Sequence, residues 1–211
     1  MATGIAGQFS TPHEQADAAR LGLWLFIATE ILFFGPLFTG YLYGRTHFYD
    51  GFAAASRHTD VLIGTINTAV LLTSSFTMAL AAEMRRTAPR AAGWLLAATA
   101  SLGAVFLILK GIEYRNEWHE QLVPGVAFVF AEPHRNAGEL FFYLYFAMTG
   151  VHALHLTVGI GIVASMSALM LRGRAFKVSP DSIDVTALYW HFVDVVWIFL
   201  YPILYLTGRA T

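Results

Sequence analysis

Five long apolar segments constrain this chain more than any other feature of its sequence. They cover approximately residues 21–43, 61–82, 91–114, 139–171 and 187–206. A helix of about 20 residues rises about 30 Å, which is the thickness of the hydrocarbon core of a bilayer. Strands of a membrane β-barrel need only about ten residues. The sequence therefore predicts an all-α polytopic membrane protein, a bundle of five transmembrane helices.

The composition agrees with a membrane protein and excludes several kinds of chemistry. The 211 residues are 56% hydrophobic and only 13% charged, whereas about 25% of the residues in soluble domains are charged. The formal net charge of −1 gives no basis for a nucleic-acid partner. Because the chain has no cysteine, a disulfide, a thiolate metal centre, a cysteine nucleophile and a thioether-linked haem are all excluded.

The chain shows no internal repeat and no separate soluble domain. Residues 1–20 are polar and lack the basic start, apolar middle and small-residue cleavage site of a signal peptide. We therefore expect a polar N-terminal segment over residues 1–20, a first helix that stays as an anchor, and one five-helix membrane domain over residues 21–207.

The distribution of basic residues predicts the orientation of the bundle. The N-terminal segment and the second and fourth loops carry Arg20, Arg85, Arg86, Arg90, Arg172, Arg174 and Lys177. The opposite side carries Arg45, Arg57, Arg115, Arg135 and Arg209, with Lys110 near that end of the third helix. Because short cytoplasmic loops are enriched in Lys and Arg, the N-terminus is expected in the cytoplasm and the C-terminus outside.

Glu30 is the most improbable residue in the chain. It lies about ten residues into the first apolar segment, within TEILFF at residues 29–34, and hence about 15 Å deep. Ionisable groups are costly at that depth and often functional, so Glu30 is either a proton-handling group or a buried structural acid. We expect a protonated or partnered carboxyl. Its predicted partner is His152 or His155 of the fourth segment, since all three lie near the membrane centre.

The sequence contains two pairs of polar residues whose members are three positions apart, which places both members of a pair on one helix face. His152 and His155 are one pair, and His191 and Asp194, within YWHFVDVVW at residues 189–197, are the other. A copper or zinc site, the alternative interpretation, would need further ligands at the same depth, whereas His191 lies nearer the inner end of its helix. We therefore expect hydrogen-bonded packing histidines and no metal or haem. His191 and Asp194 should tie the fifth helix to a neighbouring helix, with a donor for the aspartate.

The third segment ends in LKGIEYR at residues 109–115, where the Lys110 and Glu113 spacing allows a local ion pair. Such residues at the end of a membrane helix usually extend towards water within the interfacial aromatic belt. This position favours a surface cluster. The alternative is a docking rim for a partner subunit.

Four stretches resemble subunit III of the haem-copper terminal oxidases. They are TEILFF (29–34), NTAVLLTSS (67–75), TGVHALH (149–155) and YWHFVDVVW (189–197). They occur in the order of the family, and Glu113 and Tyr114 stand in the place of its Glu-Tyr pair. The chain resembles the five-helix bacterial form, because it lacks the two extra N-terminal helices of the seven-helix form.

The resemblance implies a subunit with no redox centre or catalytic residue of its own. It would pack against oxidase subunit I, with subunit II in the same complex, in a bacterial plasma membrane. The partner subunits would hold haem and copper, and the complex, a cytochrome c or quinol oxidase, would reduce dioxygen in aerobic respiration and pump protons.

The resemblance also implies roles for particular residues. Glu30 corresponds to the family's carboxyl that hydrophobic carbodiimides modify, and the subunit is expected to bind phospholipid and support proton uptake. The remaining polar positions are expected to form a structural polar network, namely His152, His155, His191, Asp194 and Glu113.

Other functions stay open at the level of the sequence. Related five-helix proteins accompany nitric oxide reductases, so an accessory subunit of such an enzyme is one alternative. A di-haem membrane anchor would need paired axial histidines. A small transporter would need polar residues along a pathway and often a helix repeat, which this sequence lacks.

Overall fold

The computed structural model describes residues 11–125, 128–130, 133–175 and 178–209. Over these residues the chain forms α1 (Pro12–His47), α2 (Tyr49–Ser56), α3 (Val61–Met84), α4 (Pro89–His119), α5 (Arg135–Leu171), α6 (Pro180–Tyr201) and the π-helical turn η2 (Pro202–Leu206). No strand occurs within the described ranges. Five helices are long and apolar enough to cross a membrane. The predicted five-helix membrane fold is thus confirmed.

Helix α1 starts earlier than the apolar pattern indicated. It begins at Pro12, inside the stretch expected to be a polar N-terminal segment, and the side chain of Thr11 accepts a hydrogen bond from the Glu14 amide at 3.2 Å. A threonine N-cap followed by proline is a favoured helix start, and it acts independently of hydrophobicity. Residues 1–10 and Lys177 lie outside the described residues.

The short helix α2 was not predicted from the sequence. It has only eight residues, too few to span a membrane, and lies in the connection between α1 and α3. The aromatic ring of Phe52 is buried there against Tyr41 of α1 and Phe141 of α5. This short helix therefore closes one end of the bundle over the aromatic core.

Two residues with left-handed backbone conformation end helices α4 and α5. Gly173 has φ +71°, and the amides of Gly173 and Arg174 donate to carbonyls of the last helical turn of α5. Gln121 has φ 57°, and the Leu122 amide donates to the Glu117 carbonyl at 2.9 Å. These are Schellman-type endings, which satisfy carbonyls that would otherwise lack partners. The ending at Gln121 fixes the last turn of α4.

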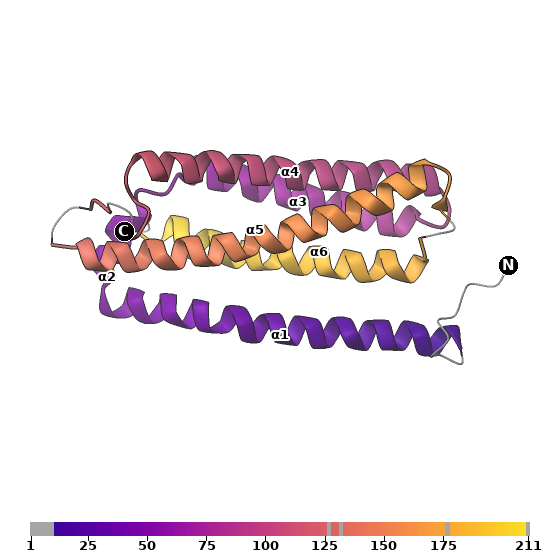
Figure 1. Cartoon of the computed structure of the whole chain (residues 1–211), viewed down its shortest axis with the longest axis horizontal. Coiled ribbons are helices and arrows are strands. Elements are labelled where there is room, and N and C mark those ends of the chain that lie inside the picture. The colour runs from indigo at the N-terminus through magenta and orange to yellow at the C-terminus, as the bar shows by residue number, and fades with distance from the viewer. Residues whose placement is uncertain (1–10, 126–127, 131–132, 176–177, 210–211) are drawn as a thin grey trace.

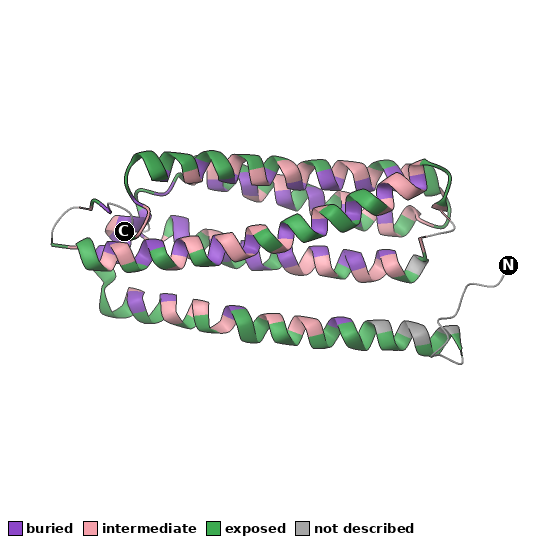
Figure 2. Cartoon of the chain, viewed as in Figure 1, coloured by how far each residue is buried: buried purple, intermediate pink, exposed green. Residues whose placement is uncertain are grey.

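Helices α3, α4, α5 and α6 form a group of four, and α1 lies along the α5 and α6 side of this group (Figure 1). Helix α5 crosses α6 obliquely. Helix α1 starts at one end of the bundle, and η2 lies at the opposite end. Figure 2 shows α1 with most of its surface exposed, while the purple, buried positions gather between the other long helices. The core therefore lies mainly inside the four-helix group.

Two tryptophans of α6 anchor that core to α3. The Trp190 indole donates to the Ser74 hydroxyl at 3.2 Å, and the Trp197 indole donates to the Thr68 hydroxyl at 3.0 Å. Both indole rings are essentially fully buried. A buried indole N–H needs an acceptor, and these hydroxyls supply it from the facing helix. The two bonds fix how α6 lies against α3.

Gly103 of α4 should be intolerant of a larger side chain, because a Cβ there would lie 2.9 Å from the Trp190 ring and 3.0 Å from the Ile160 side chain. We expect Gly103→Ala to lower the free energy of unfolding by about 1–3 kcal/mol through overpacking. The matched control is Gly111→Ala on the same helix, where a Cβ meets nothing within 4 Å. Thermal denaturation of the purified complex would compare them. Equal effects of the two substitutions would contradict this packing argument.

Candidate functional site

A carboxyl and an imidazole meet between α1 and α5. The Glu30 Oε2 atom lies 3.0 Å from the His155 Nε2 atom, and the two side chains are 13% and 19% exposed. The two atoms are within hydrogen-bonding distance, but their angles do not meet the criteria for a hydrogen bond. The pairing predicted for Glu30 is thus confirmed with His155 and not with His152.

A backbone contact fixes how the His155 ring is oriented. Its Nδ1 atom lies 2.9 Å from the Val151 carbonyl oxygen. Because a carbonyl only accepts hydrogen bonds, Nδ1 must carry a hydrogen. The Nε2 atom is then the ring nitrogen that faces the Glu30 carboxyl.

His152 makes a different contact from the one expected. Its ring is 1% exposed and lies between the rings of Phe106 and Trp197, with centroids 5.4 and 5.2 Å away. Neither ring nitrogen has a hydrogen-bond partner within the described part of the chain. The packing role is confirmed, but the expected hydrogen bond is wrong, because this face of α5 meets aromatic rings.

The predicted helix tie of His191 and Asp194 is only half present. The His191 Nδ1 atom lies 2.7 Å from the Ser75 hydroxyl, which connects α6 to α3 as expected. Asp194 is 3% exposed, and the same Ser75 hydroxyl is the donor that acts on its carboxyl, although neither carboxyl oxygen meets the geometric criteria of a hydrogen bond. The expected donor on a neighbouring helix is thus Ser75, without a fully formed hydrogen bond. Helix spacing gives the shared face of the two residues, but it does not determine which one meets the hydroxyl.

The Lys110 and Glu113 pair is present but is not at the surface. The Lys110 ammonium donates to Glu113 Oε2 at 3.0 Å and to the hydroxyls of Tyr145 at 2.7 Å and Tyr205 at 2.5 Å. The Lys110 and Glu113 side chains are only 3% and 2% exposed. The predicted surface cluster is wrong. The spacing of residues within one helix does not show that tyrosines from α5 and η2 surround the ammonium.

The histidines identified from the sequence thus have three separate environments. One faces a glutamate, one lies between aromatic rings and one contacts a serine. Over the described ranges, no group of three or more histidine, aspartate or glutamate side chains could hold a metal ion. What the arrangement can do chemically is hold and exchange protons and connect helices.

Comparison with known proteins identifies the family. Residues 4–209 match the family described as cytochrome c oxidase subunit III. The chain belongs to the cytochrome c oxidase subunit III family. This confirms the resemblance seen in the sequence.

Its relatives within the subunit III family serve both kinds of oxidase. The chain is 29% identical to cytochrome c oxidase subunit 3 of Thermostichus vulcanus, covering 98% of this chain and 96% of the relative. It is 33% identical to quinol oxidase subunit 3 of Bacillus spizizenii, covering 96% and 95%. A haem-copper oxidase subunit I+III of Aeropyrum pernix is 29% identical over 90% of this chain and 23% of that longer protein.

Membership of the subunit III family fits the five membrane-spanning helices, and it makes this chain a non-catalytic membrane subunit of a haem-copper oxidase. The alternatives, a nitric oxide reductase accessory subunit and a di-haem anchor, are not favoured by these relatives.

The Glu30 and His155 pair should contribute to the stability of the α1 and α5 interface. We expect Glu30→Ala to lower the free energy of unfolding by about 1–3 kcal/mol, because it leaves a partly buried imidazole without a partner. Glu30→Gln should cost less, since its amide can still donate to Nε2. The control is Thr29→Ala, whose exposed hydroxyl bonds only the Phe26 carbonyl of its own helix. Thermal melting of the complex should separate Glu30→Ala from this control. If the two variants melt alike, the pair is not structural.

Proposed function

We propose that this chain packs against oxidase subunit I, shares the complex with subunit II and carries no redox centre of its own. The fused relative supports the first contact, because its name joins subunits I and III in one chain. The absence of cysteine removes the thiolate ligands that a copper electron-transfer site requires. Haem and copper would then reside in the partner subunits.

We further propose that the chain lies in a bacterial plasma membrane with a cytoplasmic N-terminus and an outer C-terminus, and that it binds phospholipid. Helix α1 supports a lipid or subunit contact, because only 11% of its most apolar stretch is buried. Its exposed large side chains are Leu21, Trp24, Leu25, Ile31, Leu32, Phe33, Leu42 and Tyr43. Apolar surface of this extent is stable only against lipid or another protein.

The observation that carries the proposed role in proton uptake is the Glu30 and His155 pair. In it a carboxyl and an imidazole meet 3.0 Å apart where α1 contacts α5, at a position that residue counting puts about half-way along the first apolar segment. A change in the charge of such a pair is costly in hydrocarbon. We infer that Glu30 tunes local proton and lipid behaviour, while the main proton pathways lie in subunit I.

Chemical labelling tests the state of Glu30. A hydrophobic carbodiimide reacts with a protonated carboxyl in the membrane, so we expect it to modify Glu30 in the native complex, as read by mass spectrometry of the peptides. Glu30→Gln should abolish that modification while the complex still reduces oxygen. Equal labelling of the glutamine variant would place the reactive group elsewhere. A complete loss of turnover would make Glu30 part of the main proton pathway.

Subunit analysis tests the assignment itself. We expect the tagged chain to copurify with subunits I and II, identified by mass spectrometry. After separation from them, it should be colourless, with haem and copper far below one per chain. Retention of one haem or one copper ion per isolated chain would overturn the proposed non-redox role.

A further inference from the structure

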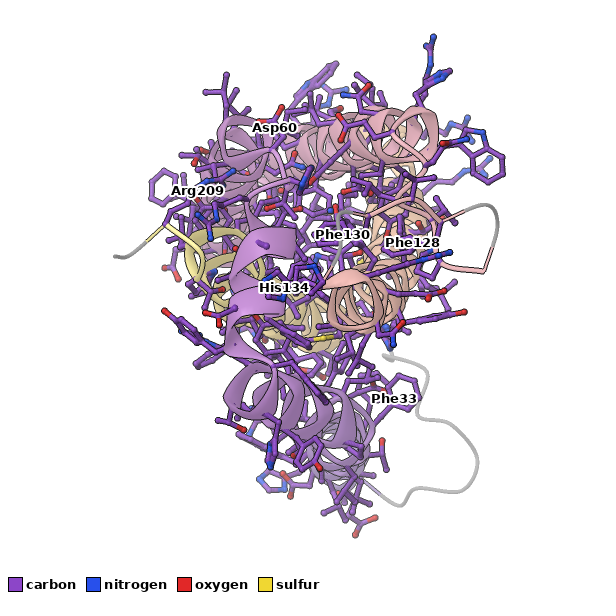
Figure 3. All side chains as sticks on the ribbon, turned by 90° about the vertical axis from the view of Figure 1, so that its left-hand side faces the viewer. Phe33, Asp60, Phe128, Phe130, His134 and Arg209 are labelled. Atoms are coloured by element: carbon purple, nitrogen blue, oxygen red, sulfur yellow. The ribbon has the colours of Figure 1, made fainter. Side chains whose placement is uncertain are left out.

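A polar cavity of about 210 Å³ lies at the end of the bundle where α4 and η2 end. Figure 3 looks onto this end and labels Asp60, the last residue of the connection from α2 to α3. The cavity lies between that connection and the last turns of α4. Its lining consists of His58, Asp60, Glu113, Asn116, Glu117 and Glu120. Four of these six side chains are carboxylates, so the protonation and partner of each one matter.

Lys110 and Glu113, at the inner side of the cavity, neutralise each other. The ammonium has three N–H donors, and all three are used by Glu113, Tyr145 and Tyr205. Each oxygen of Glu113 accepts one donor, Oε2 from Lys110 and Oε1 from the Tyr145 hydroxyl at 2.9 Å. A carboxylate that accepts a charge-assisted hydrogen bond on one oxygen and a phenol on the other is stabilised in its ionised form. All three N–H donors of Lys110 are therefore occupied, and none is left to donate a hydrogen bond to Glu117.

Glu117 lies one helical turn beyond Glu113 on α4 and lines the same cavity. It is only 3% exposed, and neither of its carboxyl oxygens has a hydrogen-bond partner among the described residues. The Schellman-type ending of α4 fixes its backbone, so the side chain is held beside the cavity. A buried carboxylate without a donor or a cation is strongly disfavoured. Among the described residues the Lys110 ammonium acts on Glu117 electrostatically, but no donor forms a hydrogen bond with its oxygens, so burial favours the neutral acid.

We propose that Glu117 is a proton-binding site, which takes its proton from a hydronium ion in this cavity while Glu113 stays paired with Lys110. One O–H bond of the hydronium ion breaks and leaves water as an O–H bond forms on one carboxyl oxygen, and water accepts the proton again when it leaves. The neutral acid removes the excess negative charge beside the Lys110 and Glu113 pair. Protonation also converts a Glu117 oxygen that accepts no hydrogen bond into a hydroxyl group that can donate one.

A metal ion is a poorer occupant, because the other oxygens around the cavity are already engaged or too far apart. Asp60 accepts the Ile63 amide at 3.0 Å, and Glu120 Oε2 lies 4.0 Å from His58 Nδ1. Over the described ranges, no three acidic or histidine side chains are grouped to hold a metal ion. A proton needs only one carboxyl oxygen, and Glu117 has two without partners.

The cavity gives this proton a route to water. Asp60 and Glu120 are exposed at its rim, and the His58 side chain is half-exposed. These polar side chains bring the mouth of the cavity into contact with water. With the orientation of the proposed function, the cavity opens to the outer side of the membrane. Proton binding itself does not depend on that orientation.

Infrared spectroscopy of the whole purified complex tests the proposal. We expect a carbonyl-stretch band of a protonated carboxyl at neutral pH that shifts promptly in D₂O. Glu117→Gln should remove this band completely and still assemble, because the amide has the shape of the neutral acid. The matched control, Glu120→Gln, changes an exposed carboxylate of the same cavity and should keep the band.

Each other outcome contradicts the proposal. If Glu117→Gln leaves the carboxyl bands unchanged, Glu117 is ionised. If that variant fails to assemble while Glu120→Gln assembles, the site does not hold a neutral acid. A melting temperature that rises with added calcium or sodium chloride in the unmodified complex, but not in Glu117→Gln, identifies a metal cation as the occupant. Loss of haem or of partner subunits from the purified complex would count against the proposed function. A change in the carboxyl bands would count only for or against proton binding by Glu117.

Discussion

An ammonium group inside a membrane protein must give every N–H donor to an acceptor, since the bilayer offers none. Lys110 meets this requirement by collecting one carboxylate from its own helix and one hydroxyl from each of two other elements, α5 and η2. The ring of Tyr145 also lies 4.4 Å from the Lys110 nitrogen, as in a cation–π contact. The end of the bundle that contains the cavity is organised around the Lys110 ammonium. Because its three N–H donors go to Glu113, Tyr145 and Tyr205, none is left for Glu117.

The same requirement explains where the other helices are joined. The Glu30 and His155 pair joins α1 to α5, and hydroxyl contacts of His191, Trp190 and Trp197 join α6 to α3. Apolar packing between membrane helices has no hydrophobic driving force against lipid, so polar contacts and close packing decide which faces meet. The most apolar stretch of α1 has the smallest buried share among the five spanning helices, which gives its carboxyl–imidazole contact with α5 unusual weight.

The sequence was informative wherever length, hydropathy or depth determined the outcome. The five spanning helices followed from segment length, and the Glu30 and His155 contact followed from matched depth in two helices. It failed where the rotation of a helix about its axis mattered. Lys110 turned inward rather than towards water, and His152 faced aromatic rings instead of a hydrogen-bond partner, because each outcome depends on which side chains of other helices face that residue. Glu117 carried no recognisable motif. Its spacing of four residues from Glu113 was the one signal that both carboxylates share a face.

The central claim is that this subunit contributes buried polar contacts and proton-holding carboxyls, rather than redox chemistry, to a haem-copper oxidase. A density map of the intact purified complex, at a resolution that shows side chains, tests it most directly. The account predicts this chain beside the subunit that holds haem and copper, no cofactor density within its own five helices, and the Glu30 carboxyl within hydrogen-bonding distance of His155. Cofactor density bound by the histidines of this chain, or a Glu30 side chain turned away from His155, would contradict the account.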